Sequence, residues 1–150
     1  INSHPHKVGK ITIVHNGIIE NYEDLRNELI NNGVKFKSET DTEVACALLN
    51  KLYEDTNDMN ETLCLFQKKV KGTYALGIIC DDDYNTLYAL KNKSPLIIAF
   101  GENENYIASD VPAILEFTNK DFKDILDGKF CDDVKIIEIY GSSLNLNDKS

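Results

Sequence analysis

The chain has 150 residues, of which 42% are hydrophobic and 27% are charged, and its formal net charge is −9. Such a composition supports one folded domain with an apolar core, and it excludes a disordered or coiled-coil protein. The acidic surface argues against nucleic acid and anionic membranes as partners, and no apolar run approaches the roughly 20 residues that a membrane-spanning helix needs.

The first predicted element is a strand over Lys10–His15, because this segment is rich in β-branched residues and is followed by Asn16 and Gly17. A helix is predicted next. Asn21 can cap its first turn and Gly33 can end it, while two leucines spaced four residues apart form its apolar face.

A second helix is predicted to begin at a capping box, in which Thr40 bonds forward into the helix and Glu43 bonds back. Its predicted apolar face consists of Val44, Ala47, Leu48 and Leu52. After a polar break, a third helix has an apolar face made of Leu63, Phe66 and Val70. Each of these helices therefore has one face suited to packing against other elements.

After Gly72 the spacing of apolar residues no longer fits a helix. The strand Thr73–Cys80 is apolar on both faces, which indicates that both faces are covered. An acidic turn then leads into further short elements, predicted as strands over Leu87–Leu90, Leu96–Phe100, Tyr106–Ser109 and Val134–Tyr140 and a helix over Val111–Phe117. Helices first and antiparallel strands afterwards indicate an α+β fold with layered sheets.

The cysteines are widely spaced in apolar segments, without a C-x-x-C pair, at Cys46, Cys64, Cys80 and Cys131. This pattern favours buried, reduced thiols over a disulfide or a metal site, and reduced thiols favour the cytoplasm. His4 and His6 have no third ligand nearby, so no metal site is predicted. No cofactor is expected either.

Asn16 and Gly17 are the first candidates for chemistry. Asn-Gly is a strong hairpin signal, and a plain turn is the simpler interpretation. The residues after Gly17 fit a helix better than a returning strand, however, so a side-chain amide and a backbone N–H would be presented at a strand end. Two such donors can stabilise one developing negative oxygen. On local grounds alone, this oxyanion site is the less favoured interpretation.

Asp41 is the second candidate. Thr40 and Glu43 already satisfy the cap of the second helix, so the cap does not need Asp41. A carboxylate in a first helical turn is favoured by the helix dipole, which is a sufficient structural reason for its presence. The functional alternative is that Asp41 receives the ammonium group of a ligand. Local reasoning favours the structural role.

Five short segments stand in order along the chain, and they are His15–Tyr22 (His-Asn-Gly-Ile-Ile-Glu-Asn-Tyr), Ser38–Val44 (Ser-Glu-Thr-Asp-Thr-Glu-Val), Gly72–Leu76, Ser94–Ile98 and Asn105–Asp110. Together they closely resemble the glutaminase domain of the glutamine–fructose-6-phosphate amidotransferase (glucosamine-6-phosphate synthase) family. The resemblance extends from His4 to about Tyr140. It implies an N-terminal-nucleophile hydrolase fold, in which two antiparallel sheets stack face to face between helical layers, α-β-β-α.

The same resemblance implies a mechanism. In the family an N-terminal cysteine thiolate attacks the carboxamide of glutamine, and the released ammonia passes to a sugar-isomerase domain on the same chain. By this resemblance Asn16 is the side-chain oxyanion donor, Gly17 is the backbone donor, and Asp41 binds the α-ammonium group of L-glutamine.

The resemblance also predicts what this sequence lacks. The family nucleophile is N-terminal, whereas this sequence begins at Ile1 and none of its cysteines matches the nucleophile. We therefore expect residues 1–150 to be a type 2 glutamine amidotransferase domain without its N-terminal segment and without the isomerase domain. We expect this piece to be inactive alone, and to form homo-oligomers through apolar faces and strand edges left bare.

Two alternatives stay open. The glutaminase domain of amidophosphoribosyltransferase shares the Asn-Gly and Thr-Asp-Thr-Glu elements, although Ile18–Tyr22 and Ser94–Ile98 favour the sugar enzyme. A non-catalytic module could instead use Asn16, Gly17 and Asp41 to bind glutamine without turnover.

Overall fold

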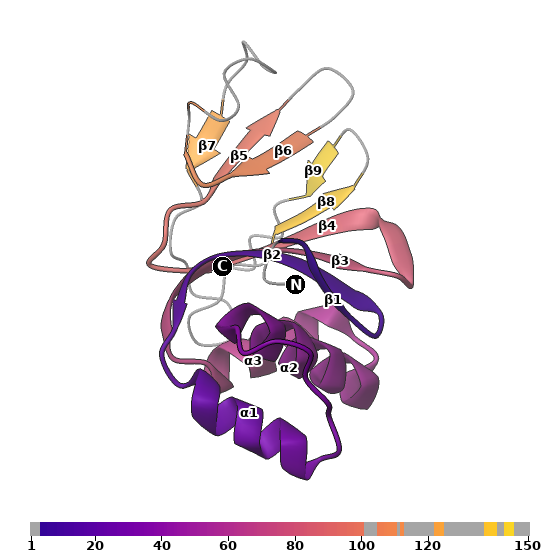
Figure 1. Cartoon of the computed structure of the whole chain (residues 1–150). Coiled ribbons are helices and arrows are strands. Elements are labelled where there is room, and N and C mark those ends of the chain that lie inside the picture. Colours follow the sequence, from indigo (N-terminus) through magenta and orange to yellow (C-terminus); the bar gives the residue numbers. More distant parts are fainter. Residues whose placement is uncertain are drawn as a thin grey trace.

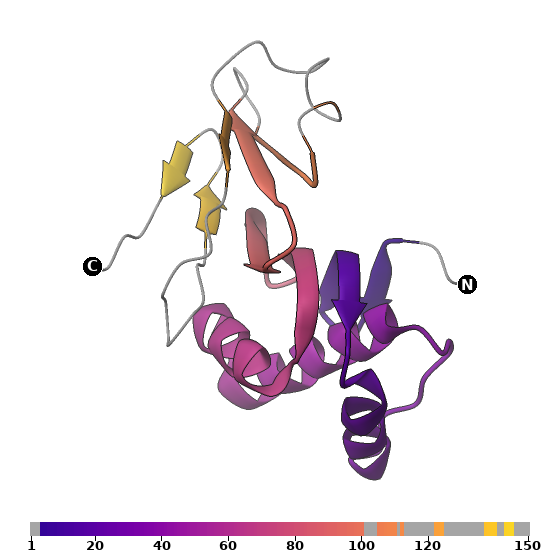
Figure 2. The same cartoon turned by 90° about the vertical axis from the view of Figure 1, so that its left-hand side faces the viewer.

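The computed structural model describes residues 4–100, 105–110, 112, 122–124, 137–140 and 143–145. Within these residues, three helices cover one face of a six-stranded sheet, and a three-stranded sheet stands on the opposite side (Figure 1). The side view in Figure 2 shows the helices at one end of the molecule and the smaller sheet at the other. All pairs of named strands are antiparallel.

The helices are α1 (Tyr22–Asn31), α2 (Asp41–Thr56) and α3 (Met59–Lys69). The strands are β1 (His6–Val8), β2 (Ile11–Ile19), β3 (Gly72–Cys80), β4 (Asp83–Asn92), β5 (Ile97–Phe100), β6 (Asn105–Ala108), β7 (Phe122–Asp124), β8 (Ile137–Tyr140) and β9 (Ser143–Asn145). The larger sheet has the order β1-β2-β3-β4-β8-β9, and the smaller one has the order β6-β5-β7. Apart from Pro112, the predicted helix over Val111–Phe117 lies outside the described residues.

β2 is longer than the sequence predicted. The strand was expected to end at His15, but it continues through Asn16 and Gly17 as far as Ile19, which pairs with Gly72 at the start of β3. The two strands have nine residues each and pair along their full length. Pairing with the long strand β3 therefore overrides the local turn tendency of Asn-Gly. The pairing gives hydrogen-bond partners to the backbone N–H and C=O groups of alternate residues of β2.

Asn21 stands at the predicted start of α1, but it does not cap the helix through its side chain. Its amide instead accepts a hydrogen bond from the N–H of Lys71 (2.9 Å) and donates one to the carbonyl of Lys69 (2.9 Å). Lys69 is the last residue of α3, and Lys71 directly precedes β3. Asn21 therefore ties the end of β2 to the start of β3, a long-range role that local spacing does not reveal.

One of the two hydrogen bonds of the predicted capping box of α2 is present. Thr40 Oγ1 accepts the N–H of Glu43 at 3.2 Å, as expected. The Glu43 carboxylate does not complete the box, because it accepts the N–H groups of Lys37 (2.8 Å) and Ser38 (2.6 Å) and the Ser38 hydroxyl (2.5 Å). Burial acts to raise the pKa of Glu43, but these hydrogen bonds outweigh it, and the pKa lies below its ordinary value. Glu43 thus fixes the loop that leads into α2.

α2 is the central helix of the core. The predicted apolar face is confirmed, since its four members are no more than 8% exposed. Ala45, Cys46 and Leu49 are buried as well, so the helix is covered over more than one face. The reason is that α2 packs on β2 and also contacts α1 and α3. This wide burial holds the first turn of α2 firmly against β2.

The prediction of reduced cysteines is confirmed for Cys46 and Cys80, which are free and buried. It is wrong for Cys64, which is disulfide-bonded. The apolar context of a cysteine does not distinguish a thiol from a disulfide, because both are buried in such segments.

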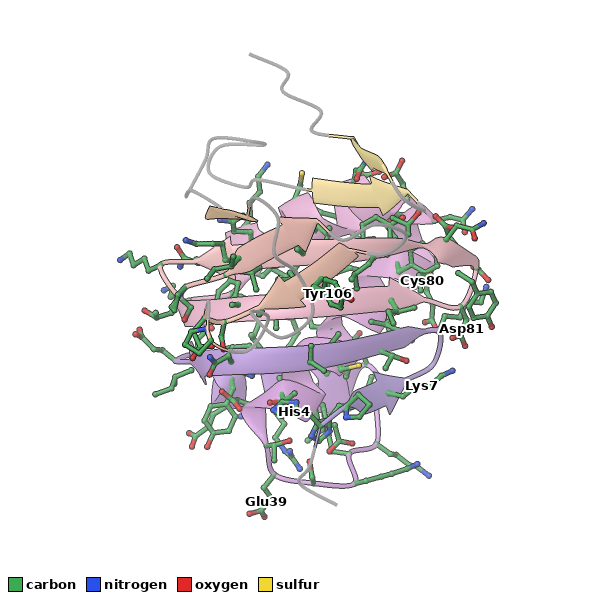
Figure 3. The ribbon with its side chains drawn as sticks, turned by 90° about the horizontal axis from the view of Figure 1, so that it is seen from above. His4, Lys7, Glu39, Cys80, Asp81 and Tyr106 are labelled. Carbon is green, nitrogen blue, oxygen red and sulfur yellow. The ribbon has the colours of Figure 1, made fainter. Side chains whose placement is uncertain are left out.

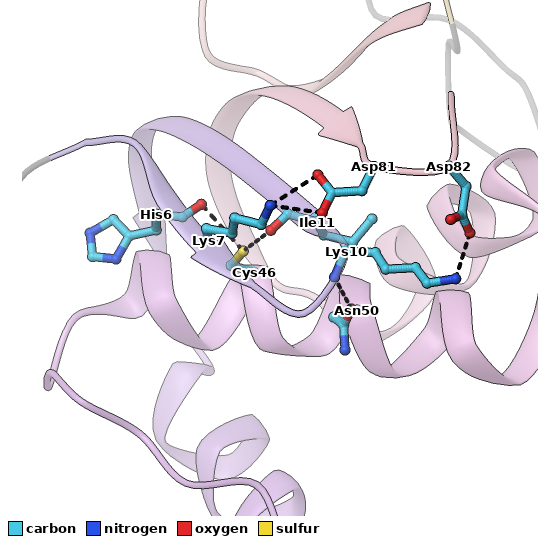
Figure 4. A network of polar contacts seen from close by, with 8 residues as sticks. All are labelled: His6, Lys7, Lys10, Ile11, Cys46, Asn50, Asp81 and Asp82. Carbon is cyan, nitrogen blue, oxygen red and sulfur yellow. Dashed lines mark hydrogen bonds and ion pairs between the residues drawn. The ribbon is translucent and has the colours of Figure 1, made fainter. Parts of the chain in front are cut away.

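A polar network ties the β1–β2 turn to the β3–β4 turn (Figure 4). Lys7 pairs with Asp81 at 2.7 Å and Lys10 pairs with Asp82 at 2.8 Å. These side chains are largely exposed, so the pairs contribute little to stability. The backbone N–H of Lys10 also donates to Asn50 Oδ1 at 3.0 Å. The network lies at the start of β2, at the opposite end of the strand from Asn16 and Gly17.

The smaller sheet covers only part of the large sheet. Ile107 of β6 lies over Gly77, with its Cδ1 3.6 Å from the position that a Cβ there would occupy. Seen from above in Figure 3, the strand with Tyr106 crosses β3, whereas β2 lies beside it. On β2, Val14 is 50% and Ile18 is 67% exposed. The face of β2 that points away from the helices is therefore open.

Candidate active site

Among the described residues, no strand covers one edge of the last part of β2. Asp81 N donates to Lys10 O and Glu20 N donates to Lys71 O, so the even-numbered positions of β2 bond to the β3 side. By alternation, the odd-numbered positions present their N–H and C=O groups to the other edge. β1 pairs with that edge only as far as Ile13. Beyond that point the backbone groups of β2 face an open edge.

Gly17 and Ile19 are two of the residues on this open edge. The N–H of Ile19 donates to Asp41 Oδ2 at 3.0 Å, which confirms the direction that the alternation predicts. The N–H of Gly17 points to the same side, two residues earlier. The structure therefore brings Gly17 and Asp41 to one edge, although they are far apart in the sequence.

Asn16 directly precedes Gly17 in the strand, and its side chain lies on a face of the sheet rather than at the edge. It alternates with buried residues that face the helices, and it is exposed on the open face of β2 together with Val14 and Ile18. A side-chain amide and a backbone N–H from adjacent residues are the kinds of donor that an oxyanion site uses.

Gly17 cannot be exchanged for another residue without disturbing the strand. Its φ is +105°, a backbone conformation that L residues rarely adopt. A Cβ at this position would lie 2.1 Å from the carbonyl oxygen of Thr73 and 3.0 Å from Ser94 Oγ. The close approach of β2 to β3 and to Ser94 therefore depends on glycine.

We expect Gly17→Ala to lower the free energy of unfolding by about 2–5 kcal/mol, because left-handed backbone costs an L residue roughly 1–2 kcal/mol and overpacking about 1–3 kcal/mol. Gly33→Ala is the matched control, since Gly33 also has a positive φ (+87°) but nothing lies within 4 Å of its Cβ position. The control should lose only about 1–2 kcal/mol. Urea denaturation measures both, and equal losses would contradict the steric argument.

Asp41 is the first residue of α2, where the helix dipole favours a negative charge. One carboxylate oxygen accepts the N–H of Ile19, while the other lies 4.0 Å from His15 Nδ1. The side chain remains 25% exposed, so a ligand can reach it. Asp41 is thus hydrogen-bonded to β2 on one side, faces His15 on another and is partly exposed to solvent.

Two residues next to these candidates were not singled out from the sequence. His15 contacts the first turn of α2, and its Nδ1 lies 2.9 Å from Thr42 Oγ1. Ser94 is buried beside Gly17. Both lie within segments that carried the family resemblance. That membership was the available signal, since neither residue stands out by local spacing.

Neither free cysteine among the described residues can act as the nucleophile here. The Cys46 thiol is buried and faces the carbonyls of His6 and Ile11, and burial raises its pKa to about 12. Cys80 pairs with Ile11, six residues from Gly17, which is about 20 Å along the strand. In the same part of the chain, no group of three or more acidic, histidine or cysteine side chains could hold a metal ion. No helix there is long and apolar enough to cross a membrane.

Comparison with known proteins identifies the family of the chain. Residues 3–116 match the family described as "Glutamine amidotransferase domain", and the chain belongs to this family. Its relatives include three enzymes named glutamine–fructose-6-phosphate aminotransferase (isomerizing). Those of Thermococcus kodakarensis and Clostridium perfringens are 46% and 48% identical over 122 residues, and each match covers 80% of this chain and 20% of the relative. That of Fusobacterium nucleatum is 41% identical over 150 residues, 99% of this chain and 23% of the relative. The chain thus spans about a fifth of their length.

Two solved structures share the fold. One is described as the allosteric regulatory enzyme of purine biosynthesis, with a TM-score of 0.71 at 20% identity over 93% of this chain and 29% of that one. The other is the glutamine phosphoribosylpyrophosphate amidotransferase of B. subtilis, with a TM-score of 0.71 at 19% identity over 98% of this chain and 31% of that one. At this identity they bear on the fold alone. The predicted α+β N-terminal-nucleophile hydrolase fold is confirmed, and the described residues contain both sheets and one helical layer.

Proposed function

We propose that Asn16, Gly17 and Asp41 form the oxyanion and ammonium-binding parts of a glutaminase site. The site releases ammonia from L-glutamine for transfer to fructose 6-phosphate. The curated relatives support this choice of acceptor by their name, whereas the purine enzymes are similar only in fold.

The spacing along the β2 edge carries the proposal. Gly17 and Ile19, whose N–H holds Asp41, are two residues apart, or about 7 Å along a strand. Glutamine measures about 6 Å from its carboxamide oxygen to its α-nitrogen by standard bond lengths. A glutamine that lies along this edge can place its carboxamide oxygen at Gly17 and its ammonium group at Asp41. Asparagine is one methylene shorter and reaches both less well.

The chemistry follows from this placement. Attack by a nucleophile on the carboxamide carbon moves negative charge onto the oxygen. The Gly17 N–H and the Asn16 amide donate to that oxygen, which lowers the barrier because both donors are already in place. The C–N bond then breaks and ammonia leaves, and water releases glutamate from the acyl intermediate. The family resemblance supplies the nucleophile, an N-terminal cysteine thiolate.

The proposal extends to the surroundings of the site. We take the chain to be part of one glutaminase domain that works in the cytoplasm with a sugar-isomerase domain. We also propose a homo-oligomer. Val14, Ile18 and Ile79 support it, since they are 43–67% exposed on the open face of the large sheet, and exposed apolar patches favour association.

Expression of the complete coding sequence tests the function. With glutamine and fructose 6-phosphate, we expect glutamate and glucosamine 6-phosphate to form in equal amounts. Phosphoribosyl pyrophosphate should not replace the sugar phosphate. Use of phosphoribosyl pyrophosphate would favour the purine enzyme, and glutamine binding without glutamate release would favour a non-catalytic module.

A further inference from the structure

The Asp41 carboxylate is hydrogen-bonded to the backbone of β2 on one side, and the buried side chain of His15 lies on the other. Asp41 Oδ2 accepts the N–H of Ile19 at 3.0 Å, and Oδ1 lies 4.0 Å from His15 Nδ1. His15 itself comes from β2, two residues before Gly17. One strand thus supplies the oxyanion donors and the groups that surround the carboxylate.

The His15 ring is locked in place. Its side chain is 2% exposed, and Nδ1 lies 2.9 Å from the hydroxyl of Thr42, the residue next to Asp41 in the first turn of α2. A hydrogen bond to Thr42 fixes that turn relative to β2. Because Asp41 is the neighbouring residue, the same bond restricts where its carboxylate can lie.

The ring can also lie beside Asp41 without cancelling its charge. Its Nε2 is buried and has no hydrogen-bond partner among the described residues, so a proton there would go unsatisfied. Burial lowers the pKa of His15, and His4 and His6 lower it further, against the opposing effect of Asp41. A neutral ring leaves the Asp41 charge available, whereas a lysine or arginine here would pair with it and compete with a ligand ammonium group.

We propose that His15 is a positioning residue, which orients Asp41 through Thr42 so that the carboxylate receives the α-ammonium group of glutamine. This inference rests on the proposed glutaminase function. It assigns His15 no contact with the substrate and no proton transfer. Its effect should therefore appear only with substrates that carry an α-ammonium group.

Glutaramate is glutamine without its amino group. Comparing the two substrates distinguishes a positioning role of His15 from a general loss of activity. In the protein made from its complete coding sequence, His15→Ala should raise KM for glutamine about tenfold, the effect of one lost hydrogen bond. We expect kcat to change less than about threefold and glutaramate hydrolysis to stay unchanged, since no Asp41 contact is made with that substrate. His15→Asn keeps a hydrogen-bonding atom near the Nδ1 position and should recover glutamine KM to within about threefold.

Thr42→Val provides a second variant if His15→Ala does not fold. It removes the hydroxyl that meets Nδ1 while it retains nearly the same shape, and it should raise KM for glutamine in the same way. Equal losses on glutamine and glutaramate, or no loss on either, would overturn the positioning role. If the wild-type protein releases no glutamate, the proposed function fails and this inference fails with it. If Asp41→Asn removes the preference for glutamine over glutaramate but the His15 and Thr42 variants do not, only the positioning role is overturned.

Discussion

Replacing Asp41 by Asn should lower kcat/KM for glutamine by roughly 30- to 150-fold. The substitution keeps the size of the side chain and can still accept the Ile19 N–H, but it removes the charge that pairs with the α-ammonium group. Loss of one partner of a desolvated charge pair costs about 2–5 kcal/mol, and we take about 2–3 kcal/mol because Asp41 stays 25% exposed. Steady-state release of glutamate measures this change.

Asp58→Asn is the matched control for Asp41→Asn. Asp58 also stands at the start of a helix, where its carboxylate accepts the N–H of Glu61 at 2.9 Å, and asparagine caps equally well. The control should leave glutamine kinetics unchanged. Hydrolysis of glutaramate by Asp41→Asn should also match the wild type. A similar loss in both variants would show that a helix start had been weakened rather than an ammonium site.

Replacing Asn16 by Ala should lower kcat by roughly 100- to 1,000-fold, while KM for glutamine changes little. One oxyanion donor contributes about 3–4 kcal/mol in the transition state and little in the ground state, where the carbonyl oxygen carries no full charge. The residue is exposed, so its truncation leaves no cavity in the core. Single-turnover release of ammonia, combined with urea denaturation, measures the two effects separately.

Asn85→Ala serves as the control for Asn16→Ala, because Asn85 is also an exposed strand residue but lies in β4 near the opposite end of the large sheet. Both variants should unfold at urea concentrations close to that of the wild type. An Asn16→Ala protein with normal kcat would remove Asn16 from the mechanism, even if glutamine is still hydrolysed.

Much of the fold follows from local patterns. The apolar face of α2 and the apolar run along β3 are strong local signals, and both elements form where they were predicted. Thr40 caps α2 as predicted, because a cap depends on residues that are neighbours in the chain. Asn16, Gly17 and Asp41 were identified through the resemblance of whole segments, since their local contexts favoured a turn and a helix start.

Other features depend on contacts between distant residues. The extension of β2 to Ile19 requires β3 as a partner, and the side chain of Asn21 bridges two residues near the start of β3 instead of capping its own helix. The second half of the capping box is lost because Glu43 finds the N–H groups of Lys37 and Ser38. In each case a polar group has more than one possible partner, and packing decides which one is within reach.

The sequence by itself determined which residues can donate to an oxyanion and which can bind an ammonium group. Tertiary structure alone decided that they lie close to one another, at the end of β2. Among the described residues, β1 stops pairing at Ile13, so the odd-numbered N–H groups of β2 beyond that point have no strand partner on that side. α2 packs across that strand and brings Asp41 to Ile19 and Thr42 to His15. The physical reason is that strand pairing and helix packing join residues about 25 positions apart, at distances that no local spacing encodes.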